Sequence, residues 1–222
     1  KPKDEWLDGG RKYWQQPADV LAWTIKLAKG KKKILDIGPG QFTFPLATHT
    51  CGWQYGPQPI KTNKIVDFTT QLLPYEDNEF DFGKAGYIET PSIMAELCRE
   101  VDASSPPYRG FHHHIWFTWV ERDKNTTPVW QFCHKFPVIE HLEFNEDYIR
   151  ETLKKYPHLW FNYYTWDGAK GPGFRHHVHD RDFCLVPSQT PLQTYGDFLA
   201  EKCRKSTDFN DKFYRTHIAT NT

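Results

Sequence analysis

The segment Lys31-Lys-Lys-Ile-Leu-Asp-Ile-Gly-Pro-Gly40 decides the fold expected for this chain. A short apolar run that ends in glycines is typical of a buried parallel strand followed by a tight turn. Gly38 and Gly40 permit backbone angles that other residues avoid, and they let a ligand approach the main chain closely. Asp36 stands at the carboxyl end of the predicted strand, which is the edge where open α/β sheets bind ligands. The segment therefore predicts an α/β fold with a ligand site at this turn.

The composition narrows the class of protein. The 222 residues carry 28 basic and 28 acidic side chains, a formal net charge of +0, so we expect neither nucleic acid nor a membrane as a partner. The 5 cysteines are scattered and include no Cys-x-x-Cys pair, which indicates reduced thiols and a cytoplasmic, intracellular protein. No apolar run reaches membrane-spanning length, and because the chain starts at Lys1, we expect further residues before it.

Three stretches together resemble class I S-adenosylmethionine-dependent methyltransferases. The segment around Asp36 is similar to the family's Asp-x-Gly-x-Gly motif, and Leu73-Pro-Tyr-Glu-Asp-Asn-Glu-Phe-Asp-Phe82 is similar to the signature before its fourth strand. Lys84-Ala-Gly-Tyr-Ile-Glu-Thr-Pro-Ser92 and Ser105-Pro-Pro-Tyr-Arg-Gly-Phe-His-His-His114 resemble blocks of an uncharacterised methyltransferase-like subgroup of viruses and bacteria.

The resemblance implies a cofactor and a set of site residues. The cofactor would be S-adenosylmethionine, with its methionine end held at Asp36, Gly38 and Gly40 and its adenine at Asp67 and Phe68. In the family an acidic residue ends the second strand and holds the ribose, whereas the matching position here is Gly52. The candidates for contact with the acceptor are Glu89, His113 and His114. Histidine is a suitable general base for a hydroxyl, while for Glu89 a structural role near the Thr90–Ser92 turn is the more ordinary interpretation.

The predicted fold is an α/β, Rossmann-like methyltransferase sheet that is reduced in helices and has a C-terminal antiparallel strand pair. We divide the chain into a lead-in with a covering helix (1–30), a methyltransferase-like domain (31–205) and a loose polar tail (206–222). Helices are predicted over 17–29, 41–48, 91–101, 147–155 and 192–205, with Ser92 as the cap of the third. Strands are predicted over 49–53, 64–68, 111–120 and 132–142, and the antiparallel pair over 159–166 and 174–186.

The interval between Phe82 and Gly86 departs from the family. Parallel neighbours need a crossover of a dozen or more residues, which Gly83-Lys-Ala85 does not provide. We expect either a lost βα unit, which would leave one face of the sheet without its helix, or a segment that is missing from this sequence. A second copy of the chain could cover that face in a homodimer. Otherwise the cover would come from aromatic residues of the second half, namely Trp116, Phe117, Trp119, Trp130, Phe132, Trp160 and Tyr164.

The histidine clusters suggest a different chemistry. On strands, His112 and His114 would share one face, and His177 and His179 would share another. Two such pairs on neighbouring strands could hold a divalent ion, although surface or ring-stacked histidines explain the same spacing.

Three functions therefore remain open on the sequence. The first is methyl transfer from S-adenosylmethionine to a hydroxyl of a small molecule or glycan. The second is a non-catalytic interaction protein of methyltransferase descent, and the third is a histidine-ligated metalloenzyme.

Overall fold

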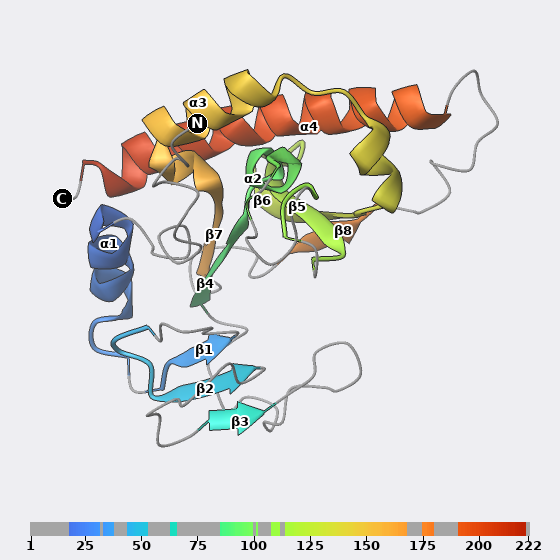
Figure 1. The fold of residues 1–222 in the computed structure, drawn as a ribbon. Helices are drawn as coiled ribbons and strands as arrows, with labels where there is room; N and C mark the ends of the chain where they lie inside the picture. The colour runs from blue at the N-terminus through green and yellow to red at the C-terminus, as the bar shows by residue number, and fades with distance from the viewer. Residues whose placement is uncertain are drawn as a thin grey trace, which may run out of the picture.

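The chain is a mixed α/β protein with several small sheets and few helices (Figure 1). The computed structural model describes residues 18–31, 33–37, 44–52, 63–65, 85–99, 101, 108–111, 114–167, 175–179 and 191–220. Within these ranges no helix combines the length and the apolar character that crossing a membrane requires.

The predicted parallel strands form a small sheet of their own. Its strands are β1 (Leu35–Ile37), β2 (His49–Gly52) and β3 (Asn63–Ile65), parallel and in the order β1-β2-β3. Figure 1 shows this sheet set apart from the other strands, beyond the first residues of β4. The strand expected before the glycine turn is therefore confirmed, while Gly38 and Gly40 themselves lie outside the described residues.

The helix predicted over 41–48 is not formed in its described part. Residues 44–48 make a turn, in which the Ala47 N–H donates to the Phe44 carbonyl at 2.9 Å. Pro45 explains the difference, because a proline inside a helix removes a donor and crowds the preceding turn.

The strand after this sheet leaves it and pairs elsewhere. β4 (Ala85–Pro91) is antiparallel to β7 (Phe161–Asp167), from Ala85 opposite Asp167 to Pro91 opposite Phe161. A third sheet contains β5 (Trp116–Arg122), β6 (Pro128–His134) and β8 (His176–Val178), with β5 antiparallel and β8 parallel to β6. A single Rossmann-like sheet is thus not seen among the described strands.

The predicted antiparallel pairing of 159–166 with 174–186 is wrong for the described part of the second segment, residues 175–179, and the rest of that segment lies outside the described residues. β7 pairs with β4, and β8 is added to the edge of β6. Burial explains the choice: neighbouring residues Tyr163 and Tyr164 of β7 are both buried, so both faces of that strand are covered. β8 is exposed along its three residues and is held by backbone bonds, among them the Trp130 N–H to the Arg175 carbonyl.

The helices follow the predictions more closely, apart from their ends. They are α1 (Ala18–Ala28), α2 (Ile93–Leu97), α3 (Glu146–Lys155) and α4 (Pro191–Phe213), with short helical turns η1 (Pro137–His141), η2 (Pro157–Trp160) and η4 (Tyr214–Ile218). The expected cap of α2 is confirmed, because the Ser92 hydroxyl accepts a hydrogen bond from the Ala95 N–H.

The loose tail predicted from Ser206 is wrong, because α4 continues to Phe213. Leu199, Ser206 and Asn210 are all buried, and their spacing puts them on one side of the helix. The polar composition was misleading because two of these polar side chains have partners in the interior.

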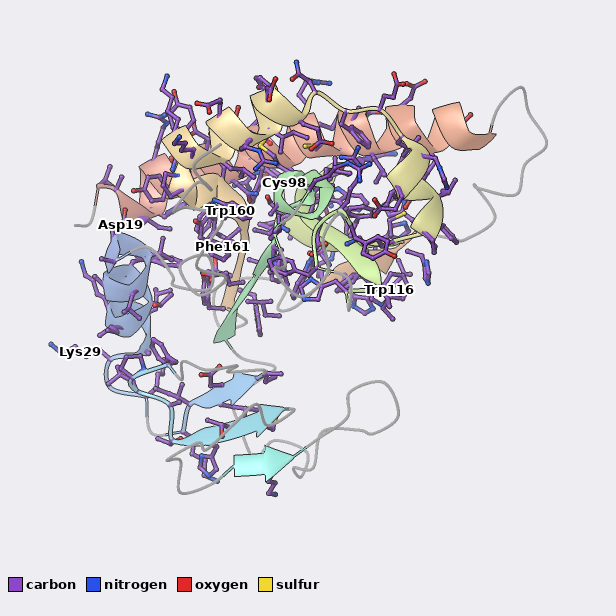
Figure 2. All side chains as sticks on the ribbon, in the orientation of Figure 1. Asp19, Lys29, Cys98, Trp116, Trp160 and Phe161 are labelled. Atoms are coloured by element: carbon purple, nitrogen blue, oxygen red, sulfur yellow. The ribbon has the colours of Figure 1, made fainter. Side chains whose placement is uncertain are left out.

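The aromatic residues expected to cover the parallel sheet line other cores instead. Trp119 and Trp160 belong to the largest cluster, which joins α2, α3, α4 and the β5–β6 hairpin, and Trp130 and Tyr164 form another between β6 and β7. Figure 2 shows Trp160 and Cys98 in the interior beneath α3 and α4. The prediction that these rings fold over β1–β3 is therefore wrong.

Helix α1 lies between the β1–β3 sheet and the C-terminal turn η4 (Figure 1). Asp19, at its start, lies beside η4, and Lys29 lies toward the β1–β3 sheet (Figure 2). Val20 and Trp23 are buried against Tyr163 and Ile218, and the Tyr214 hydroxyl donates to Asp19 Oδ2. The helix thus packs on the C-terminal segment, 195 residues away along the chain.

One side-chain amide joins four elements in the interior. Asn162 of β7 is 1% exposed, and its Nδ2 donates to the carbonyls of Pro91 at 2.9 Å and Thr118 at 2.7 Å. Its Oδ1 accepts from Ser206 Oγ at 3.1 Å and from Asn210 Nδ2 at 3.0 Å. The amide therefore links β7 to β4, to β5 and to α4.

Replacing this amide should destabilise the whole fold. We expect Asn162→Ala to lower the free energy of unfolding by about 3–4 kcal/mol, because buried donors and acceptors on three elements lose their partner together. Urea denaturation followed by tryptophan fluorescence measures this. The matched control is Asn125→Ala in the exposed β5–β6 turn, for which we expect a change within about 0.5 kcal/mol. Equal effects of the two variants would contradict the assignment.

Candidate functional site

The first candidate residue, Asp36, lies at the carboxyl end of β1. It is half-buried, and its Oδ2 accepts a hydrogen bond from the Phe44 N–H at 2.7 Å. Burial raises the pKa of this carboxyl, and the hydrogen bond opposes that rise. A cation placed beside Asp36 would favour the charged carboxylate and offset its loss of hydration. Asp36 is thus a half-buried hydrogen-bond acceptor at the carboxyl end of β1.

The structure describes little of the rest of the predicted cofactor site. Gly38, Gly40, Asp67 and Phe68 lie outside the described residues. Gly52 ends β2, so the described part of β2 offers no carboxylate to a ribose. The neighbouring thiol of Cys51 is buried, and burial together with the charge of Asp36 raises its pKa to about 11, so it stays protonated at neutral pH.

Glu89 lies inside β4, whereas the sequence analysis placed it near a turn at Thr90–Ser92. The Tyr87 hydroxyl donates to Glu89 Oε2 at 2.5 Å, and Tyr163 of β7 is the residue opposite Glu89. Glu89 belongs to the β4–β7 sheet, whereas Asp36 belongs to the parallel sheet. The Glu89 carboxylate thus accepts a hydrogen bond from a residue of its own strand.

His114 is held by a buried carboxylate that the sequence analysis did not single out. Its Nδ1 lies 2.6 Å from Oε1 of Glu96, which is on α2. The other oxygen of Glu96 accepts from Lys135 Nζ at 2.7 Å and from the Phe111 N–H at 3.2 Å. A histidine oriented by a carboxylate is a common arrangement in general bases. His113 lies outside the described residues.

A signal for Glu96 was nevertheless present. All five residues of α2, Ile-Met-Ala-Glu-Leu, are buried, so the helix is apolar except for one carboxylate. A lone charge in an otherwise buried segment requires a partner. Lys135 gave the matching signal for the partner, because it is a charged residue between the ring-bearing residues His134 and Phe136.

The metal-site hypothesis gains no support from the described residues. His114 precedes β5 and lies on a loop, so the prediction that a strand pairs it with His112 is wrong. His177 and His179 do lie together, with ring centroids 4.7 Å apart, and His179 Nε2 contacts Gln131 Oε1 at 3.1 Å. Across the ranges that the structure covers, no group of three His, Cys, Asp or Glu side chains is arranged to hold a metal ion.

A second histidine–carboxylate pair joins α4 to η2. His158 Nε2 lies 2.9 Å from Asp211 Oδ1, and its ring stacks on Tyr214 with centroids 4.0 Å apart. Burial lowers the pKa of His158, although Asp211 opposes that change. Because His158 is 8% exposed and packed between elements, we assign it a structural role.

Comparison with known proteins leaves the family open. No protein-family model, curated protein or solved structure significantly matches this chain.

The contact between the 108–111 segment and Glu96 should depend on a glycine. Gly110 has φ +59°, and a Cβ built there would lie 2.3 Å from a carboxylate oxygen of Glu96. We expect Gly110→Ala to destabilise the protein by about 3 kcal/mol or more, since a strained backbone angle adds to a clash with a buried charge. Thermal unfolding measures the loss.

Gly30 provides the matched control for that substitution. Its φ is +82°, but a Cβ there has no neighbour within 4 Å. Gly30→Ala should therefore cost only the backbone strain, about 1–2 kcal/mol. If both variants lost the same stability, the close approach to Glu96 would have no energetic role.

His158 should make stability depend on pH. Its lowered pKa means that the folded state binds a proton less readily than the unfolded chain. The contribution of this residue is therefore full above about pH 6.5, the ordinary histidine value, and is lost as the pH falls through the lowered value. We expect His158→Phe, which keeps a ring against Tyr214, to lose stability less steeply than wild type between pH 7.5 and pH 5.

Urea denaturation at several pH values measures that slope. Tyr214→Phe is the control, because it removes the hydroxyl bonded to Asp19 but keeps the titrating imidazole and a stacking ring. This control should be less stable than wild type at every pH and retain its slope. An unchanged slope in His158→Phe would contradict the prediction.

Proposed function

We propose that the protein transfers a methyl group from S-adenosylmethionine to a hydroxyl of a small molecule or glycan. The observation that carries this proposal is the parallel order β1-β2-β3 with a half-buried carboxylate, Asp36, at the carboxyl end of β1. Ligands of open α/β sheets bind at that edge, and burial there increases the benefit of a cationic ligand. In this proposal the small sheet is the part of a Rossmann-like methyltransferase sheet that holds the cofactor.

Each candidate residue has a role in this reaction. S-adenosylmethionine, when bound, supplies an electrophilic methyl group. Asp36 would bind the ammonium of its methionine end beside the turn predicted at Gly38 and Gly40, and Asp67 and Phe68 would contact the adenine. Positioning and timely removal of a proton are the main tasks of the protein in such a reaction. Those tasks fall to the acceptor-side candidates Glu89, His113 and His114.

A non-catalytic interaction protein is the second candidate, and two contacts favour it. Glu89 accepts from Tyr87, and His114 bonds to Glu96, so both acceptor-side candidates that the structure describes also have structural partners. In addition, β4 pairs with β7 and does not extend the parallel sheet. A protein that kept only the cofactor half of the fold would show these features.

Calorimetric titration with S-adenosylmethionine and with its demethylated product tests the proposal. We expect Asp36→Asn to weaken binding at least 10-fold, because the neutral amide keeps the shape of the side chain but loses a charge-assisted bond. The control is Asp147→Asn in the exposed first turn of α3, which should bind as wild type does. Absence of binding by the wild-type protein at millimolar ligand would favour the second candidate.

A further inference from the structure

The turn that follows the long helix α4 differs in kind from the helix itself. α4 is α-helical to Phe213, whereas η4 is π-helical, and the Ala219 N–H donates to the Tyr214 carbonyl at 2.9 Å. Phe213 and Ala219 flank this turn, and both have right-handed helical backbone angles. The π turn is therefore an insertion within a helical stretch. Because π turns are rare, such an insertion indicates a local cause.

The π turn brings Ile218 to the surface that α1 covers. Residues five apart lie about 140° apart around an α-helix, but they lie on the same side of a π turn, whose hydrogen bond spans five residues. Phe213 and Ile218 are five apart, and both pack with Val20 and Trp23 of α1. Ile218 is 0% exposed, whereas His217 is exposed and contacts the Phe213 ring with centroids 4.7 Å apart.

A regular α-helix would present a different residue to α1. Side chains four apart share a face of an α-helix, so His217 would take the place that Ile218 has beside Phe213. Ile218 would be rotated away from that face. The contact would then contain an imidazole in place of an aliphatic side chain, and it would bury less apolar surface. The π turn and the docked position of α1 therefore favour each other.

Helix α1 depends on this surface in turn. It buries two apolar side chains, Val20 and Trp23, and Trp23 meets the Phe213 ring edge-on with centroids 5.7 Å apart. At the start of α1 the Tyr214 hydroxyl donates to Asp19 Oδ2 (Figure 2). The 11 residues of α1 would be only marginally helical in water without such packing. The stability of α1 thus comes from the segment that contains the π turn.

We propose that α1 and η4 form a two-state switch. With α1 docked, the turn after Phe213 is π-helical and Ile218 faces α1; with α1 released, the same residues form a regular α-helix and His217 takes that position. Shifts of helix register and packing are a known way in which packed elements change state. Because α1 precedes β1 in the chain, the switch links the C-terminal segment to the strand that carries Asp36. It does not depend on the proposed methyl transfer.

The first test removes α1 from its site in the full-length protein. Val20→Lys places a charge against Trp23 and Ile218, and Ala22→Lys, on the exposed side of α1, is the matched control. Carbon-13 NMR spectra report the backbone conformation over 213–219 and the surroundings of the Ile218 methyl groups, whose signals Ile218→Val identifies.

We expect the Ile218 methyl signals to be shifted by the neighbouring aromatic rings in the wild type and in Ala22→Lys. In Val20→Lys that shift should disappear, and the backbone signals over 213–219 should become uniformly α-helical. Wild-type signals over 214–218 in Val20→Lys would show that the π turn does not respond to α1, and random-coil signals there would show that no second helical state exists. Either result overturns the proposal.

The second test deletes one residue from the turn. A π turn contains one residue more than the α turn it replaces, so deletion of the exposed Thr216 leaves Ile218 four positions after Phe213. A regular α-helix then presents Ile218 to α1. We expect this variant to unfold at a temperature equal to or above that of the wild type, with α1 docked and with α-helical signals throughout.

Deletion of the exposed Asp208 is the matched control. It shortens a regular part of α4 and turns every later residue by about 100°, so Asn210 no longer meets Asn162. We expect this control to lower the midpoint of thermal unfolding by about 5 °C or more. A similar loss on deletion of Thr216 would show that the contact with α1 requires the π turn itself, and it would overturn the proposal.

Discussion

The amide of Asn162 is the interaction on which the arrangement of the sheets depends. A two-stranded sheet such as β4–β7 buries too little surface to be stable alone, so it must be fastened to its neighbours. Asn162 lies at the point where β4, β5, β7 and α4 meet, and it bonds to all three of its neighbours from inside the core. An apolar side chain there could fill the space but could not fix one orientation of these elements, because only hydrogen bonds are directional.

The same constraint explains the length of α4. A helix that ended at Lys205 would leave Asn162 Oδ1 without its donors, Ser206 and Asn210. A buried acceptor that lacks a partner costs about 1–3 kcal/mol, which is a large part of the net stability of a domain. The extended helix also carries Tyr214 to Asp19, so the position of α1 follows from it. The buried polar groups therefore explain why α4 continues beyond Lys205.

Local patterns in the sequence predicted local structure well. Ser92 was expected as a cap and is one, and the parallel strands β2 and β3 begin at 49 and 63, beside the predicted starts at 49 and 64. Both ends of α1 and of α3 also lie within one residue of the predicted ends. Each of these features rests on residues a few positions apart, for which caps, periodicity and turn residues are sufficient signals.

Pairing between distant segments could not be predicted in this way. β7 pairs with β4, 70 or more residues away, because its two faces each need a covering layer, and alternation within 161–167 does not say which strand lies beside it. The site prediction was incomplete for the same reason: His114 was found by its neighbours in sequence, but its partner Glu96 lies on α2, and Lys135, which bonds to Glu96, follows β6. A charged residue inside an apolar run predicts that a partner exists without saying which one.

The two candidate functions differ in what the burial of Glu96 accomplishes. A carboxylate and an ammonium taken from water are not stabilising in themselves, since apolar residues of the same volume would often serve the fold as well or better. Around Glu96 the backbone is held by Arg109 and Glu140, and Glu96 itself also accepts from the Phe111 N–H. What Glu96 adds is a defined ring orientation at a partly exposed histidine, 27% exposed where its partners are nearly inaccessible. A proton acceptor depends on that orientation, whereas an interaction protein needs only the packing that the same contacts provide, so the contact by itself is compatible with both candidate functions.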